Sequence, residues 1–277
     1  MRFKTLMKLF TVMVFTIASS NFIVYAETNT VCLKNAHAHN DYRHDRPLQD
    51  ALEHGFKSVE ADIFLKNGQL LVGHNLFELT VHRTLESLYL KPLFNRVNDN
   101  DGYVYKDKEE LLLLIDFKND GDKVYPVLDQ LLDKYKSMLT SYNNGEVTHR
   151  AVKIIITGDR PWEMIINDKN RYVAIDGNIK HLTGNYSASV MPVVSENWNS
   201  CFSWKGNGPM PEHEYEFLKG IVSNAHKKGM IVRFWASPDK PSPQRTAIWQ
   251  TLFETGVDLI NTDDLDGLTE FLKSKQN

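Results

Sequence analysis

Residues 58–65 read SVEADIFL, an apolar strand pattern that carries two carboxylates, Glu60 and Asp62, two positions apart. It is one of eight short apolar runs, and segments with apolar residues every three or four positions, as in amphipathic helices, separate most of them. Such alternation favours parallel β-α-β units, and eight units predict an α/β fold, a single-domain (β/α)8 TIM barrel. The alternative is an open doubly wound sheet, but no G-x-G-x-x-G motif follows the first strand. The expected strands are residues 31–38, 58–65, 111–117, 152–157, 172–175, 191–195, 230–235 and 257–261.

The composition excludes several classes of protein. The 277 residues carry a formal charge of −3, which argues against a strongly basic nucleic-acid binder, so no nucleic-acid partner is expected. Two cysteines exclude a disulfide-rich scaffold and a cysteine-based zinc module. No feature indicates an obligate protein partner.

The first 26 residues have the pattern of a secretory signal peptide. Three basic residues precede an apolar stretch, and small residues lead to a cleavage site after Ala26. A membrane anchor is the alternative, but the apolar stretch is short and interrupted. We therefore expect a signal peptide at residues 1–26, a barrel at 27–277 and a secreted or periplasmic protein. No later apolar run is long enough to span a bilayer, so the mature chain is expected to lack an integral membrane segment.

Ionisable residues spaced two apart end three of the expected strands, and this spacing places both side chains on one face of a strand. The pairs are His37 with His39, Glu60 with Asp62, and Asp116 with Lys118. A carboxylate in an apolar strand is costly unless it is paired or bound to a metal. A buried salt-bridge network with Lys118 is one explanation. The other explanation is that Glu60, Asp62 and Asp116 bind one divalent cation, Mg²⁺ or Ca²⁺. The repetition of the pair pattern at three strand ends favours this metal site.

His74 is expected to join this group through a hairpin. Asn67-Gly68 is a strong two-residue turn signal, and pairing across it sets Asp62 opposite Gly73. Strict alternation would turn His74 to the other face of the sheet, so we expect a bulge at Gly73 that turns it inward.

The ordered set of residues resembles the phospholipase C-like phosphodiesterase superfamily, which includes glycerophosphodiester phosphodiesterases and sphingomyelinase D enzymes. The matching residues are His39, Glu60, Asp62, His74, Asp116 and Lys118, and the segments RFW (233–235) and VDLINTD (257–263) resemble the last strands of such barrels. The start HAHNDY (37–42), with RTL (83–85) and LYL (88–90), is most similar to the branch of the altered inheritance of mitochondria protein 6 proteins. Glycerophosphodiesterases commonly begin with H-R-G, so the arginine beside the histidine is missing here.

The resemblance implies a metal-dependent phosphoric diester hydrolase that acts on a small-molecule or lipid substrate of the glycerophosphodiester or phospholipid type. His39 and His74 would serve as base and acid, in an order that the sequence leaves open, and Lys118 would add positive charge near the phosphate. His39, nearer the barrel mouth, is expected to matter more than His37. The residues expected to contact the substrate are Asn40, Tyr42, Trp198 and Trp235.

Two other functions remain as alternatives. Amidohydrolase barrels also begin with H-x-H, but they need histidines at the ends of strands five and six, where this chain has Asp176 and Glu196. A secreted binding barrel without catalysis is the third possibility. However, all six positions that carry the resemblance hold residues capable of the proposed chemistry.

The two cysteines are expected to stay unpaired, although an exported protein meets an oxidising environment. Cys32 opens the first strand, and Cys201 follows the sixth strand on the opposite, catalytic face of the barrel. A disulfide needs Cα atoms within about 7 Å, which this polarity does not allow.

Overall fold

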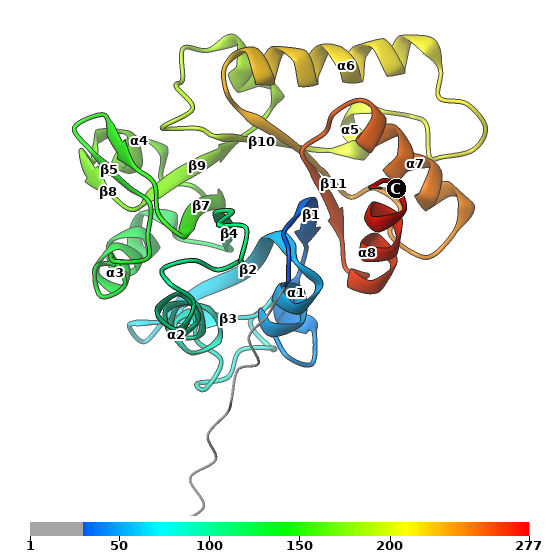
Figure 1. Ribbon diagram of the computed structural model, residues 1–277. Coiled ribbons are helices and arrows are strands. Elements are labelled where there is room, and N and C mark those ends of the chain that lie inside the picture. Colours follow the sequence, from blue (N-terminus) through cyan, green and yellow to red (C-terminus); the bar gives the residue numbers. More distant parts are fainter. Residues whose placement is uncertain (1–29, 277) are drawn as a thin grey trace, which may run out of the picture.

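The computed structural model describes residues 30–276, and its centre is a closed barrel of eight parallel strands. Around the barrel the strands lie in the order β1, β12, β11, β10, β9, β7, β4 and β2, and pairing between β1 and β2 closes the ring (Figure 1). Their bounds are β1 Leu33–Ala38, β2 Phe56–Lys66, β4 Leu111–Phe117, β7 Val152–Gly158, β9 Val173–Gly177, β10 Val193–Asn197, β11 Ile231–Trp235 and β12 Leu259–Thr262. The predicted (β/α)8 barrel is confirmed.

Helices surround the barrel (Figure 1). They are α1 Gln49–His54, α2 Lys91–Asp99, α3 Gly121–Asp133, α4 Trp162–Asn167, α5 Trp198–Cys201, α6 Glu212–Lys227, α7 Pro243–Glu254 and α8 Leu265–Ser274. Shorter turns lie at η1 Asp41–Arg43, η2 Glu86–Leu90 and η3 Ile179–Thr183. The connection from β9 to β10 contains only η3, so the helical layer is incomplete beside the fifth strand.

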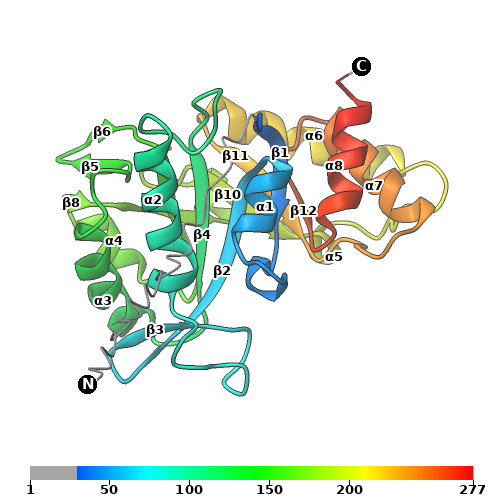
Figure 2. The ribbon, with the colours of Figure 1, turned by 60° about the horizontal axis from the view of Figure 1, so that its bottom comes forward.

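Two additions to the barrel come from antiparallel pairing. Strand β3, Gln69–Val72, forms the expected hairpin with β2, which runs on past the barrel toward it (Figure 2). A separate small sheet contains β5 Ser141–Asn143, β6 Glu146–Thr148 and β8 Asn170–Arg171. The sequence pattern did not predict this sheet, because strands of two or three residues are too short to show a period.

The packing of β4 shows how the sequence directs polar groups to the mouth of the barrel. Parallel strands are covered on both faces, which explains the continuous apolar run LLLLI in β4. Leu112 and Leu114 belong to a small apolar cluster separate from the main core between strands and helices. Asp116 is next on the same face, at the carboxyl end of the strand. The interior therefore changes from apolar to acidic where a barrel presents its active site.

The predicted signal peptide, residues 1–26, lies outside the described residues. Within residues 30–276, no helix has the length and apolar character needed to cross a membrane.

Both cysteines are free thiols in the described part of the chain. Cys32 precedes β1, and Cys201 ends α5, which follows β10. Because a strand rises ~3.3 Å per residue, opposite ends of the barrel are too far apart for a disulfide. Burial raises the pKa of Cys32 to about 12 and that of Cys201 to about 11, so both thiols are protonated at neutral pH.

We predict two free thiols per chain, measured with a chromogenic disulfide reagent on unfolded, unreduced protein. A pre-reduced sample is the control and should give the same count. A monomer that shows two thiols only after reduction would contradict the placement of Cys32 and Cys201 at opposite ends of the barrel.

Candidate active site

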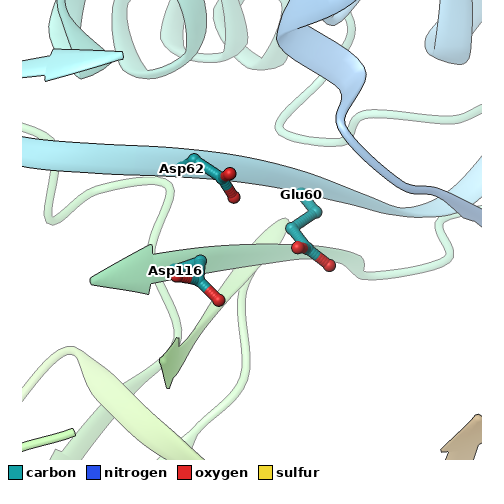
Figure 3. A group of neighbouring side chains, drawn as sticks. All are labelled: Glu60, Asp62 and Asp116. Atoms are coloured by element: carbon teal, nitrogen blue, oxygen red, sulfur yellow. The ribbon is translucent and has the colours of Figure 1, made fainter. Parts of the chain in front are cut away.

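Three carboxylates converge at the mouth of the barrel (Figure 3). Strand register places Asp62 of β2 directly opposite Asp116 of β4, and Glu60 lies two residues before Asp62 on the same face. Each of the three residues offers an oxygen atom, and these atoms all lie within 4.8 Å of one another. Like charges at this spacing repel strongly unless cations lie among them.

Lys118 supplies one such cation. Its ammonium nitrogen lies 2.7 Å from Asp62 Oδ2 and 3.3 Å from Asp116 Oδ1. Burial lowers the pKa of Lys118, but the two carboxylates outweigh burial and raise it, so the lysine stays charged. Burial raises the pKa of Asp116 to about 6, against the opposing effect of Lys118.

The two oxygens of the Asp62 carboxylate have different surroundings. Oδ2 accepts hydrogen bonds from the Tyr42 hydroxyl at 2.7 Å and His74 Nδ1 at 2.9 Å, in addition to its ion pair with Lys118. Oδ1 is buried and has no hydrogen-bond partner among the described residues. A buried, unpaired carboxylate oxygen next to two further carboxylates fits a hard divalent cation, which prefers oxygen ligands. The acidic triad is therefore compatible with a divalent metal ion.

His74 reaches the site by a simpler route than predicted. The β2–β3 ladder is regular from Lys66 with Gln69 to Ile63 with Val72, and β3 ends there. Gly73 then donates its N–H to the Asp62 carbonyl at 3.1 Å, and the chain leaves the ladder. The expected bulge at Gly73 was wrong, because a residue beyond the end of a strand no longer has to alternate between faces. The His74 ring nevertheless lies against Asp62 as expected.

His39 forms a second histidine–carboxylate pair. It follows β1, and its Nδ1 lies 2.8 Å from Oδ1 of Asp263, which follows β12. The Asn40 amide nitrogen lies 2.8 Å from His39 Nδ1 and donates to the same Asp263 oxygen at 3.2 Å. With Nδ1–H donating to Asp263, the free lone pair of His39 is on Nε2. Burial lowers the pKa of His39, but Asp263 and Glu60 together raise it above its usual value.

His37 lies deeper in the barrel and is fully buried. Its Nδ1 lies 2.8 Å from Ser58 Oγ and its Nε2 lies 2.7 Å from Arg233 Nη1. Burial and the Arg233 charge lower the pKa of His37 to about 4, so the ring is neutral. The same guanidinium donates to Glu60, whose pKa lies well below its usual value. Sequence reasoning missed this role of Arg233, because its partners lie about 170 and 200 positions away along the chain.

A cavity of about 370 Å³ opens over this cluster. Its lining includes the predicted residues His39, Glu60, His74, Asp116, Lys118 and Trp235. It also includes residues that were not predicted for the site, among them Arg160, Asp176, Asn178, Ser195, Glu196 and Arg233. Most of the additions come from strands five to seven, where the sequence shows single polar residues without the paired spacing of the first strands.

Three of the four expected substrate contacts are placed elsewhere. Trp198 has 0 % exposure and packs against Phe202 and Phe234, so it is a core residue and the prediction was wrong. Asn40 and Tyr42 are buried and are not among the residues that line the cavity, and the Tyr42 hydroxyl contacts both Asp62 and Asn40. Tyr42 thereby orients Asp62 of the acidic cluster, and Asn40 orients Tyr42. Trp235, which is 40 % exposed, does line the cavity.

Gly158 makes room for the cluster. It is the last residue of β7 and has a φ of 71°, and a Cβ atom there would lie 2.5 Å from Asp116 Oδ1. Only glycine combines this left-handed conformation with the close approach of a carboxylate.

The geometry disfavours an amidohydrolase centre. The residues available near the ends of the fifth and sixth strands are Asp176 and Glu196, and His181 lies in η3, where its ring stacks on Trp162 at 4.5 Å. No histidine from these strands joins His37 and His39 in the described part of the chain.

Comparison with known proteins finds chains of similar sequence. A family profile described as "AIM6-like phosphodiesterase domain" matches residues 26–176. An altered inheritance of mitochondria protein 6 homolog from Arthroderma benhamiae is 32% identical over 255 residues, which cover 83% of this chain and 81% of that protein. The corresponding protein of Lachancea thermotolerans is 32% identical over 283 residues, 87% of this chain and 66% of its own length.

Two crystal structures share the fold. A glycerophosphodiester phosphodiesterase from Parabacteroides distasonis aligns over 90% of this chain and 99% of its own, with a TM-score of 0.53 and 14% identity. The phosphatidylinositol-specific phospholipase C of Listeria monocytogenes aligns over 90% of this chain and 96% of its own, with a TM-score of 0.50 and 9% identity. At such identities the likeness concerns the barrel itself.

The two tryptophans provide a test of these placements. Trp198→Phe removes the indole N–H that donates to the Trp204 carbonyl at 3.0 Å in the core, so the free energy of unfolding should fall by about 1–3 kcal/mol. Trp235→Phe, at the exposed rim, should change it by less than about 0.5 kcal/mol. Urea titration of both variants measures the difference. Equal losses would contradict the assignment of Trp198 to the core and of Trp235 to the cavity.

Proposed function

The chain belongs to the AIM6-like phosphodiesterase family, and on that premise we propose that it is a metal-dependent phosphoric diester hydrolase acting on a glycerophosphodiester or a phospholipid-type substrate. The observation that supports this proposal best is one cluster of three carboxylates, one lysine and two carboxylate-paired histidines, of which all but the buried Asp62 line a single cavity. Phosphodiester cleavage requires that the charge on the phosphate be neutralised, that the attacking hydroxyl lose a proton and that the leaving oxygen gain one.

Glu60, Asp62 and Asp116 would hold one Mg²⁺ or Ca²⁺ ion, since all three offer oxygen atoms and neither cation favours nitrogen or sulfur. When bound, such an ion supplies Lewis-acid stabilisation of a phosphate oxygen. Lys118 lines the same cavity and contributes a fixed positive charge beside the phosphate.

His39 is proposed as the general base. Its pairing with Asp263 raises its pKa and leaves Nε2 to accept a proton from the attacking hydroxyl. His74 also lines the cavity and is held through Nδ1 by Asp62, so its other ring nitrogen is proposed to donate a proton to the leaving oxygen.

We also propose that the reaction takes place outside the cytoplasm. The pattern of residues 1–26 supports export, which would place the enzyme outside the cytoplasm, with a small-molecule or lipid diester as its partner.

Metal removal tests the proposal directly. Because three clustered carboxylates need a counter-charge, EDTA should abolish hydrolysis of bis(p-nitrophenyl) phosphate, and Mg²⁺ or Ca²⁺ should restore it. The same ion should raise the melting temperature of the wild-type protein and should not raise that of Asp116→Asn. Asp133→Asn, an exposed carboxylate on α3, is the matched control.

Other outcomes would point to other functions. Full activity in a thoroughly chelated sample would remove the metal from the mechanism. Two tightly bound zinc ions would favour an amidohydrolase, and the absence of any turnover with a divalent ion would favour a binding barrel.

The role of His39 predicts a shift in pH dependence. A base must be unprotonated, so kcat/KM should rise with pH through the pKa of His39. Asp263→Asn removes the charge that raises this pKa, so the acidic limb should move to lower pH, while the plateau falls by about 10²-fold. Asp266→Asn, at an exposed position of α8, should leave the profile unchanged. An unshifted limb in Asp263→Asn would assign the base elsewhere.

A further inference from the structure

Asp239 is a half-buried carboxylate to which the proposed mechanism gives no role. It lies in the connection from β11 to α7, and it is not among the described residues that line the cavity. Both of its oxygens accept hydrogen bonds from the end of β12. Oδ1 accepts from the Thr262 hydroxyl at 2.6 Å, and Oδ2 accepts from the Asp263 N–H at 2.7 Å.

These two donors belong to the segment that holds His39. Thr262 is fully buried, and its carbonyl accepts the His39 N–H at 2.9 Å. The next residue, Asp263, holds the His39 ring through its own carboxylate at 2.8 Å. Asp239 therefore bonds to the two consecutive residues that fix the backbone and the ring of the proposed base.

The hydrogen bonds around Asp239 have a defined direction and a fixed support. The Thr262 hydroxyl oxygen accepts the Asp264 N–H at 2.9 Å, so its single proton is directed to Asp239. Arg245 of α7 donates to the Asp239 carbonyl at 3.0 Å and pairs with Asp264 at 2.6 Å. Because Asp264 caps α8, these contacts connect Asp239 to two helices of the outer layer.

The position of Asp263 makes such a support necessary. Asp263 lies beyond the end of β12, and its side chain is 52 % exposed. An exposed carboxylate can turn to solvent, and its interaction with a histidine weakens with distance. The Asn40 amide contacts the carboxylate itself, whereas the bond to Asp239 fixes the backbone from which the carboxylate projects.

We infer that Asp239 is a positioning residue for the general base, because it holds Thr262 and Asp263 so that the Asp263 carboxylate stays on Nδ1 of His39. The inference rests on the proposed role of His39 in phosphodiester hydrolysis. It assigns part of the orientation of the base to the connection that follows β11, on the neighbouring strand.

Two variants separate this role from a direct effect of charge. Asp239→Ala removes both hydrogen bonds together with the negative charge. Asp239→Asn removes the same charge but keeps both contacts, since its carbonyl oxygen can accept the Asp263 N–H and its amide can donate to the Thr262 hydroxyl oxygen. A difference between the two variants therefore reports the hydrogen bonds alone.

The first measurement is the pKa of His39 in the metal-free protein. NMR titration of the histidine rings gives it, with His39→Gln to assign the signal. Asp263 and Glu60 raise this pKa, whereas burial and Arg233 lower it. The pKa of His39 should be lower in Asp239→Ala than in Asp239→Asn, because a displaced Asp263 stabilises the protonated ring less.

The second measurement is the pH profile of kcat/KM on bis(p-nitrophenyl) phosphate. The acidic limb should move to lower pH in Asp239→Ala, and the plateau should fall about tenfold or more because the base is misplaced. Asp239→Asn should stay within about twofold of the wild-type plateau.

Glu214→Ala is the matched control. Glu214 is buried, and it accepts from the Ser203 hydroxyl at 2.5 Å and from the N–H groups of Ser203 and Trp204 at 2.9 and 3.1 Å. The variant therefore removes bonds of the same kinds elsewhere in the barrel. It should lower the melting temperature, as Asp239→Ala does, and should leave the titration of His39 unchanged.

The other outcomes overturn the inference or decide it separately from the function. Equal pKa values of His39 in Asp239→Ala and Asp239→Asn would leave only an effect of charge, or none, and would overturn it. If Asp239→Ala does not fold, Thr262→Val replaces it, because this variant removes the hydroxyl bond and no charge. An unchanged pKa of His39 in Thr262→Val would then refute the inference, and a lowered one would support it. If the wild type shows no turnover with Mg²⁺ or Ca²⁺, the proposed function fails, and the NMR titration still decides the role of Asp239.

Discussion

The site depends on one electrostatic constraint, the placement of Asp62 and Asp116 in register on neighbouring parallel strands. Two carboxylates this close in a barrel mouth are unstable without positive charge, and the surrounding structure supplies it. Lys118 lies between them, Arg233 pairs with Glu60 from the opposite side of the barrel, and the donors on Asp62 Oδ2 leave Oδ1 without a partner. The same clustering that costs stability is what a divalent cation would relieve.

Much of the fold and of the acidic cluster could be predicted from the sequence, because both rest on short-range periodicity. The two-residue period of a strand puts Glu60 beside Asp62, and the rule that barrel sites lie at the carboxyl ends of strands brings Asp116 to them. Residues that contribute to the site as single polar positions on their strands, without a partner two positions away, could not be found in this way. Asp176 and Arg233 acquire their meaning from partners on distant strands. Trp198 shows the opposite error, a residue predicted for the site that lies in the core, because an aromatic residue just after a strand can equally be a core residue.

The departure from the H-R-G start has a structural counterpart. Asn40 occupies the position after the histidine with a φ of 47°, a left-handed conformation that asparagine tolerates. Its amide donates to Asp263, and its Oδ1 shares the single Tyr42 hydroxyl proton with Asp62, so that Asn40 links the His39 pair to the Asp62 pair. At the position where glycerophosphodiesterases commonly have arginine, Asn40 therefore connects the two histidine–carboxylate pairs. Positive charge in the cavity comes instead from Lys118, Arg160 and Arg233.

Strand β1 pairs with both β2 and β12, and these pairings close the barrel. This closure determines when, during synthesis of the chain, activity can arise. His39 is among the first residues of the fold to leave the ribosome, and Asp263 is among the last, 224 positions later. The histidine–carboxylate pair therefore cannot form before Asp263 has been synthesised, even after the earlier strands have paired. A truncated translation product that retained His39, the acidic cluster and Lys118 would still lack the carboxylate that orients the proposed base. Any activity that depends on this pair thus arises only after β12 has joined β1.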